Sequence, residues 1–346
     1  MTTSEATAPA APVAKKGPNA IGITIFVLLL FALPLLLPVV LPLLGGIITL
    51  KPNFMIFQLT LVIIYAIAIL GLNIVTGYNG QFSLGHGAFY AIGAYTAAIL
   101  MDKLDCPYWL TIPISGVVCL VVGFLFGLPA LRLQGHYLAL ATFALALAVP
   151  QLLKYNHIEW LTGGVQGIVI IKPDPPFGIK AINADQWLYY LALVVACIMF
   201  WLAINLIRGR LGRAMIAIRD HPIAAEVMGI NLTVVKSMAF GISAAYTGVA
   251  GALGAIAIAF VAPDSFTIFL SISFLVGLVI GGLASISGAI YGGIFIQFIP
   301  NVADAISKAA PWAIYGLFLI AAVYVMPTGA AGLIKQWQAK RRAAKQ

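Results

Sequence analysis

Polar side chains that could bind a solute are gathered in one glycine-rich stretch, residues 77–87. Four of its eleven residues are glycine, a density that disfavours a continuous helix and lets backbones approach closely. Gln81 and Ser83 could hydrogen-bond a passing polar solute, and exposed amides at a helix start could meet a carboxylate. For His86, a lone histidine at a membrane boundary, we expect a neutral side chain hydrogen-bonded to backbone rather than a proton relay. No second histidine or acid lies nearby to form a metal site or a dyad. The chemistry predicted here is hydrogen bonding.

A second glycine-rich stretch, residues 281–291, repeats part of this pattern. The matching pieces, with one residue fewer between them in the second stretch, are Gly80-x-x-Ser83 and Gly282-x-x-Ser285, then Gly87-Ala88-x-Tyr90 and Gly288-Ala289-x-Tyr291. Paired broken segments in two halves of a chain point to the pathway of a membrane transporter. Close helix packing is the alternative explanation. The residues predicted to line a pathway are Asn79, Gly80, Gln81, Ser83, Gly85, His86, Gly87, Tyr90, Gly282, Ser285, Gly288 and Tyr291.

Nothing in the sequence forms a catalytic constellation. The four histidines are far apart and have no nearby nucleophile pattern, and the three cysteines lack the CxxC spacing of a metal or redox site. No G-x-x-x-x-G-K-[ST] motif is present to hold nucleotide phosphates. We therefore predict no metal site, no cofactor and no enzymatic activity in this chain. The residues concerned are His86, His136, His157 and His221, and Cys106, Cys119 and Cys197.

The elements that must position these residues are membrane-spanning helices. Hydrophobic residues make up 62% of the 346, and charged residues 8%, against roughly 25% in soluble domains. This predicts an all-α polytopic membrane protein with about ten transmembrane segments and a glycine-broken or re-entrant segment in each half. Residues 1–20 are predicted to be a flexible tail, 21–334 the transmembrane domain and 335–346 a basic tail. The ten charge-poor runs are 21–44, 54–76, 87–101, 110–131, 137–153, 187–207, 237–260, 265–283, 286–300 and 311–326.

The distribution of charge predicts the orientation of these runs. With both termini in the cytoplasm, 13 of the 19 basic residues lie inside and seven of the ten acids outside, as the positive-inside rule requires. The basic balance is thus a topology signal and does not indicate a nucleic-acid partner. None of the ten runs contains an acidic or basic residue, which disfavours a secondary carrier or channel that works alone, since ion-coupled carriers commonly keep an ionisable group at membrane depth.

Residues 208–236 form the longest predicted cytoplasmic loop. Asp220 is placed to cap a short helix, Pro222 lies in its first turn, and Gly229 can supply a left-handed stop. A helix of this length is unstable alone in water, so it must dock on its own bundle or on a cytoplasmic partner. On the opposite side, residues 154–186 form the one sizeable outer loop. Its candidate docking residues, which could equally form a cap over the pathway, are Trp160, Thr162, Gly163 and Gly164.

Several of these motifs resemble one family. Residues 213–253, with Ala-Ala-Glu-x-x-Gly-Ile at 224–230 and the small-residue run 239–253, are similar to the coupling loop of ABC importer permeases, more narrowly the branched-chain amino acid permease family of the LivM type. Residues 71–95, 130–142 and 161–168 resemble its first-half glycine, middle and outer-loop motifs, in the same order.

The resemblance implies one of two membrane subunits of an ATP-driven importer. The expected partners are a second similar permease, two ATP-binding cassette subunits that hold ATP and Mg²⁺, an external solute-binding protein and membrane lipid. The implied location is the bacterial cytoplasmic membrane. The implied cargo is a branched-chain or other hydrophobic amino acid, with urea, short amides or aromatic acids as alternatives. The positions implied to contact the ATPase are Asp220, Pro222, Ala224, Ala225, Glu226 and Gly229.

Overall fold

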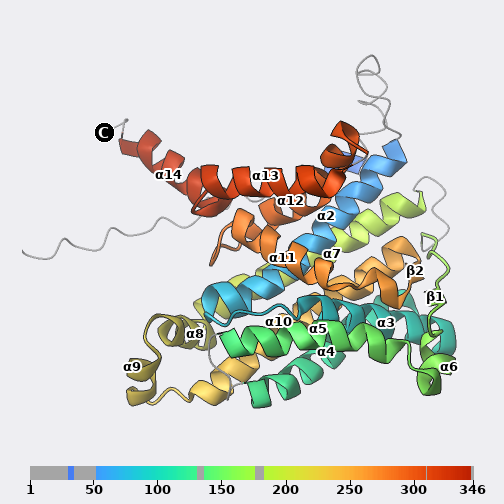
Figure 1. The fold of residues 1–346 in the computed structure, drawn as a ribbon, viewed down its shortest axis with the longest axis horizontal. Helices are drawn as coiled ribbons and strands as arrows, with labels where there is room; N and C mark the ends of the chain where they lie inside the picture. The colour runs from blue at the N-terminus through green and yellow to red at the C-terminus, as the bar shows by residue number, and fades with distance from the viewer. Residues whose placement is uncertain (1–29, 35–51, 131–135, 176–182, 309, 344–346) are drawn as a thin grey trace, which may run out of the picture. The chain divides into compact units, whose positions relative to one another are not determined.

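The computed structural model describes residues 30–34, 52–130, 136–175, 183–308 and 310–343 (Figure 1). The chain divides into two units at Pro52. In the first unit residues 30–34 are helical, while the rest of the predicted first span and the predicted tail 1–20 lie outside the described residues. The second unit holds both glycine-rich stretches and the predicted cytoplasmic loop, residues 208–236.

Helices dominate the second unit, as expected where backbone polar groups must be satisfied without water. The first half contains α2 (Pro52–Leu72), the π-helix η1 (Asn73–Tyr78), α3 (His86–Leu104), α4 (Tyr108–Ala130), α5 (His136–Leu153), η2 (Asn156–Ile158), α6 (Glu159–Thr162) and the strand β1 (Ile168–Val169). The second half contains α7 (Ala184–Arg208), α8 (Arg210–Asp220), α9 (Pro222–Val227), α10 (Leu232–Ile258), β2 (Phe260–Val261), η4 (Pro263–Ser265), α11 (Ile268–Gly281), α12 (Gly288–Ile306), α13 (Pro311–Val325) and α14 (Gly329–Ala343).

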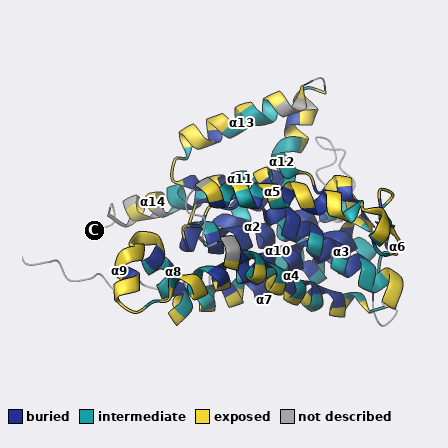
Figure 2. Ribbon diagram, turned by 60° about the horizontal axis from the view of Figure 1, so that its bottom comes forward, coloured by how far each residue is buried: buried dark blue, intermediate teal, exposed yellow. Residues whose placement is uncertain are grey.

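Helices α2, α3 and α10 form the interior of this unit (Figure 2). In its most apolar part α10 is 83% buried, whereas the span from 313 to 334 is 11% buried. Small residues bring α3, α4 and α10 together, because a side chain at Gly93 would collide with the backbone of Gly248, and one at Gly123 with Ala244. Such residues allow the close helix packing typical of membrane bundles.

Apolar side chains are exposed on the surrounding helices. Val121 on α4, Ile198 on α7 and Leu317 on α13 are all about half exposed or more. Exposed apolar surface on this many neighbouring helices suits a protein surrounded by lipid or by other membrane subunits.

Six of the described helical segments are long and apolar enough to span a membrane, and a seventh span results if the bent pair α5 and η2–α6 counts as one. The all-α polytopic class is therefore confirmed, whereas the described residues do not confirm the predicted count of about ten. Helices α3 and α12, each of which follows a glycine-rich stretch, are not among the six. The six segments are 52–78, 108–128, 184–208, 232–258, 263–281 and 313–334.

Helix α3 also departs from its expected length. It runs over 19 residues and begins inside the glycine-rich stretch, whereas the predicted charge-poor run covers 87–101 only. Its last turn continues through Asp102 and Lys103, which lowers its hydropathy while extending the helix. Helix α14 likewise extends into the predicted basic tail, which is helical to Ala343.

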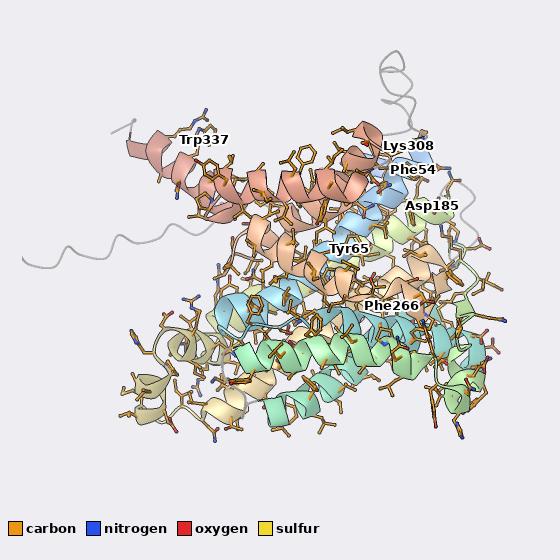
Figure 3. All side chains as sticks on the ribbon, in the orientation of Figure 1. Phe54, Tyr65, Asp185, Phe266, Lys308 and Trp337 are labelled. Atoms are coloured by element: carbon orange, nitrogen blue, oxygen red, sulfur yellow. The ribbon has the colours of Figure 1, made fainter. Side chains whose placement is uncertain are left out.

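Segments that the charge pattern assigns to one side of the membrane lie together. At one end β1 pairs with β2 through Ile168 and Val261, Lys154 forms an ion pair with Asp264, and Lys172 pairs with Asp185 at 2.7 Å. Helices α8 and α9 lie at the opposite end (Figure 1). Among labelled side chains, Phe54, Asp185 and Lys308 lie toward the first end and Trp337 toward the second (Figure 3).

Candidate functional site

The first glycine-rich stretch breaks the helical path, as the sequence predicted. The π-helix η1 widens the last turns of α2, and α3 begins only at His86. Between them Gly80 has a φ of +74°, a conformation that favours glycine. The chain is held in this turn by the Gln81 amide, which donates to the Val75 carbonyl at 3.0 Å, and by the Thr76 hydroxyl, which donates to the Gln81 carbonyl at 3.0 Å. We call residues 79–85 the first break.

Two predicted pathway residues of the first break bind each other. The Asn79 amide donates to Gln81 Oε1 at 2.6 Å, and both side chains are buried. The remaining oxygen, Asn79 Oδ1, is buried and has no hydrogen-bond partner among the described residues. It is thus an acceptor that a donor group could reach only by a rearrangement of the site.

His86 was expected to bond the backbone, but its ring nitrogens instead bond two serine hydroxyls. Its Nε2 lies 2.6 Å from Ser243 Oγ, and its Nδ1 lies 3.1 Å from Ser83 Oγ. Ser243 donates its single proton to the Gly71 carbonyl at 2.5 Å, so it must accept from His86 Nε2–H. Nδ1 then accepts from Ser83, which is the bonding of a neutral imidazole. The backbone was the wrong partner because α10, distant in sequence, supplies Ser243 next to the break.

Amides around the start of α3 are bound by protein groups. The Gly87 amide donates to Ser271 Oγ at 2.8 Å and the Leu84 amide to Thr142 Oγ1 at 2.9 Å. The Gly85 amide donates to Ser83 Oγ at 3.3 Å. The sequence suggested that such amides could meet a substrate carboxylate, but in this conformation all three are already bound. Side chains from α5 and α11 satisfy two of them.

The second glycine-rich stretch is also broken, and it lies against η1. Helix α11 ends at Gly281 and α12 begins at Gly288; between them Gly282 and Ala284 have positive φ values of 114° and 52°. The Asn73 side chain donates to the Ser285 carbonyl at 2.8 Å, and its Oδ1 accepts from the Ala284 amide at 2.9 Å. The two predicted segments are thus brought together by Asn73. We call residues 282–287 the second break.

Several predicted pathway glycines are tightly packed. A side chain at Gly85 would lie 3.0 Å from the Thr142 carbonyl, one at Gly87 2.5 Å from Ser271 Oγ, and one at Gly288 2.7 Å from the Gly281 carbonyl. For these three positions the contacts match close helix packing, the alternative explanation. Pathway lining remains a prediction for the side chains of the set, among which Tyr90 is buried against Phe266 and Phe274, Ser285 is buried and Tyr291 is half-buried.

The predicted cytoplasmic loop folds into α8 and α9; α9 matches the short helix expected after Pro222, whereas α8 was not predicted. Helix α9 ends in a Schellman motif, in which the Ile230 amide donates to the Ala225 carbonyl at 3.0 Å and the Gly229 amide to the Glu226 carbonyl at 2.9 Å. Gly229 has a φ of +85°, the predicted left-handed stop. Asp220 is not the expected cap: His221 occupies the N-cap position without a side-chain bond, and the Asp220 carboxylate instead accepts from Arg219 Nε at 2.9 Å.

Helix α9 is docked by one residue and exposed elsewhere. Ala225 is buried, while Ile223, Val227 and Met228 are 77%, 81% and 83% exposed. Predicted contact residues Pro222, Ala224 and Glu226 are exposed as well, and Glu226 lines a shallow depression with Gly229 and Lys236. We call Ile223, Val227 and Met228 the apolar patch of α9.

The predicted outer loop, residues 154–186, is shaped largely by its own candidate docking residues. The Thr162 hydroxyl bonds the Leu153 carbonyl at 2.8 Å and accepts from the Gly164 amide at 3.3 Å. Gly163 and Gly164 have positive φ values of 70° and 56°. These contacts fix the shape of the loop, whereas Trp160 is 73% exposed and accessible to another protein.

Three residues that join these sites were not predicted: Asn73, Arg219 and Ser243. Arg219 Nη1 donates to the Gly77 carbonyl at 3.0 Å and so connects α8 to the end of η1. A signal existed for Asn73, because a buried amide in an apolar run is costly unless it is bound. Arg219 and Ser243 gave none, since both sit in contexts where such residues are common.

Broken helices that meet at one end of an apolar bundle, beside an exposed helical loop, define a polytopic helical membrane protein of the permease class. Residues 54–326 match the family described as branched-chain amino acid transport system / permease component, and the chain belongs to this family.

Two similar proteins are the High-affinity branched-chain amino acid transport system permease proteins LivM of Salmonella typhimurium, 39% identical over 65% of this chain, and of Escherichia coli, 38% identical over 68%. The matched part spans 58% and 60% of the length of those relatives. The LivH permease protein of Salmonella typhimurium is 26% identical over 78% of the chain and 91% of its own length. No solved structure matches the chain.

Proposed function

We propose that this chain is a membrane subunit of an ATP-driven importer and moves its substrate inward by alternating access. The observation that carries this proposal is the exposed apolar patch of α9, at the end of the bundle where the two breaks meet. An apolar surface on a short docked helix suits a groove on a partner protein better than it suits water. Membership of the permease family supports the same interpretation.

The proposed substrate is a branched-chain or other hydrophobic amino acid. Relatives of both the LivM and LivH types carry branched-chain amino acid transport in their names. The interior beyond the first break is apolar and aromatic: Tyr90 packs on Phe274 with ring centres 5.6 Å apart, and Tyr65 packs on Phe274 at 6.0 Å. Such surroundings suit an apolar side chain, with urea, short amides and aromatic acids as alternative cargo.

We propose that four kinds of partner, the membrane lipid included, surround this chain in the importer. A second permease, two ATPase subunits that bind ATP and Mg²⁺, and an external binding protein would assemble with this chain in the bacterial cytoplasmic membrane, and this chain would have no enzymatic activity of its own. The ATPase would contact α9 and the binding protein the loop around Trp160. Both termini would be cytoplasmic, and α3, α12 and residues 21–44 would bring the spans to about ten.

Uptake of radiolabelled leucine into vesicles tests this function. We expect uptake only when the partner subunits are present and ATP is supplied at the face that carries the ATPases. ATP-dependent complexes that ignore leucine would move the cargo to urea, amides or aromatic acids. Leucine uptake by the chain alone, driven by a proton or sodium gradient, would contradict the ATP-driven mechanism.

A further inference from the structure

Arg219 is bound on two sides at the junction of α8 and α9. Its Nε donates to Asp220 Oδ1 at 2.9 Å, and its Nη1 donates to the Gly77 carbonyl at 3.0 Å. One residue, His221, separates α8 from α9. The planar guanidinium holds both bonds in a fixed geometry, so a displacement of this junction must either move Gly77 or break a bond.

The end of η1 is shaped to receive this side chain. Carbonyls in the last turn of a helix lack intrahelical partners, and a cation at that end is favourable. Arg219 supplies both a donor and a charge to Gly77. Its stem fills the space beside Gly80, where an added side chain would lie 2.8 Å from Arg219 Cγ. Gly80 thus has two roles: its positive φ permits the turn, and its lack of a side chain leaves room for Arg219.

From Gly77 the contacts continue into the second break. A side chain at Gly77 would lie 2.6 Å from the Ala284 amide and would also collide with Asn73 Oδ1. Asn73, one turn before Gly77, binds both Ala284 and Ser285. Arg219, Gly77, Asn73 and Ala284 therefore form one continuous set of contacts from the α8–α9 junction to both breaks.

We propose that Arg219 is a positioning residue for transport: it transfers displacement of α9 to the first break through Gly77, and to the second break through Asn73. This inference rests on the proposed function, in which an ATPase acts on α9. Hydrogen-bond networks and packed side chains can carry coupling between sites, and the Arg219 to Gly77 bond joins the α8–α9 junction to η1.

The test compares Arg219→Gln and Arg219→Lys with the matched control Arg213→Gln. Arg213 lies on the same helix, is exposed and donates to the Arg208 carbonyl at 2.9 Å. Within the part of the chain that the structure describes, it forms no hydrogen bond with either break. In vesicles holding the assembled importer, leucine uptake and ATP hydrolysis are measured together. We expect R219Q to retain assembly and ATP hydrolysis while leucine taken up per ATP hydrolysed falls roughly 3- to 30-fold. R219K should be intermediate, and R213Q should match the wild type.

A second measurement needs no partners. Hydrogen–deuterium exchange of the full chain in lipid nanodiscs should show faster exchange at the amides of residues 77–84 in R219Q and not in R213Q. A wild-type transport ratio in R219Q, unchanged exchange in R219Q, or loss of assembly in both R219Q and R219K would overturn the role of Arg219. Failure of the wild-type assembly to import leucine with ATP would instead count against the proposed function, and the exchange measurement would still decide the structural coupling.

Discussion

Asn73 joins two segments that lie more than 200 residues apart in the chain. Its Oδ1 accepts from the Ala284 amide at 2.9 Å, and its Nδ2 donates to the Ser285 carbonyl at 2.8 Å. A break in a membrane helix leaves backbone groups that must be satisfied within the protein. One amide side chain does so here for a donor and an acceptor, and it holds Ala284 at a φ of +52° that a non-glycine residue rarely adopts.

Replacing Asn73 by leucine should destabilise the protein by about 1–3 kcal/mol for each backbone group left unpaired. The side chain is fully buried, so water cannot replace the lost bonds. Thermal unfolding of the detergent-solubilised chain measures the effect. Asn205→Leu, a change of the same chemistry at an exposed position on α7, is the control and should leave the melting temperature nearly unchanged. Equal melting temperatures for both variants would contradict the bridging role.

Glycine at position 93 is predicted to be required for the contact of α3 with α10. A methyl group at Gly93 would collide with the backbone of Gly248, so Gly93→Ala should cost about 1–3 kcal/mol through overpacking. Gly316→Ala on α13 is the matched control, because nothing lies within 4 Å of its added methyl group. It should be neutral or raise stability by up to about 1 kcal/mol through helix propensity. Melting temperatures that fall equally in both variants would refute the packing argument.

Two buried serines offer a similar comparison for His86. Ser243→Ala removes the acceptor for His86 Nε2–H and the donor to the Gly71 carbonyl, and it should cost about 1–3 kcal/mol. Ser115→Ala should cost little or be stabilising, since Ser115 Oγ is buried without a hydrogen-bond partner in the described part of the chain. Unfolding in a denaturant series would distinguish the two. A Ser115→Ala variant as unstable as Ser243→Ala would contradict the assigned network.

The local features of the site were predictable from sequence, and the contacts between them were not. Glycine density located both breaks, and Pro222 and Gly229 bounded α9, because these residue types act on their own backbone. Asn73 and Arg219 act on backbone 212 and 142 residues away, and no periodicity records such a pairing. Asp220 was misplaced as a cap because Arg219, its immediate neighbour, binds its carboxylate.

The spans show the same limit. Apolar runs predicted the helical class, but the length of a charge-free run does not predict the residue at which the helix ends. Helix α3 continues past its apolar run through Asp102 and Lys103, and α14 carries helix into the predicted basic tail. Charge therefore did not predict the ends of these two helices, since a helix at a membrane surface can extend into water.

The apolar patch of α9 is predicted to contact the ATPase of the proposed importer. Replacing Ile223 or Val227 by aspartate should lower the affinity for the ATPase subunit by roughly 10- to 100-fold, as expected for a central apolar contact. Stability should not change, because both side chains are exposed. Val165→Asp, at an apolar residue of the predicted outer loop that is 62% exposed, is the control. Co-purification of the two subunits measures the effect, and undiminished recruitment by both α9 variants would contradict the assignment.

Gly229 separates backbone strain from steric contact at the end of α9. Its φ is +85°, and an added methyl group would meet nothing within 4 Å. Gly229→Ala should therefore cost only the strain of a left-handed residue, about 1–2 kcal/mol, paid by loosening the Schellman bonds that end the helix. Gly229→Asn should cost less, because asparagine tolerates this conformation. If the ATPase recognises α9 in its folded form, its dissociation constant for the detergent-solubilised permease should rise roughly 5- to 30-fold in G229A and less in G229N. Equal losses in the two variants would mean that the partner requires the absence of a side chain at this position, and not the shape of the helix end.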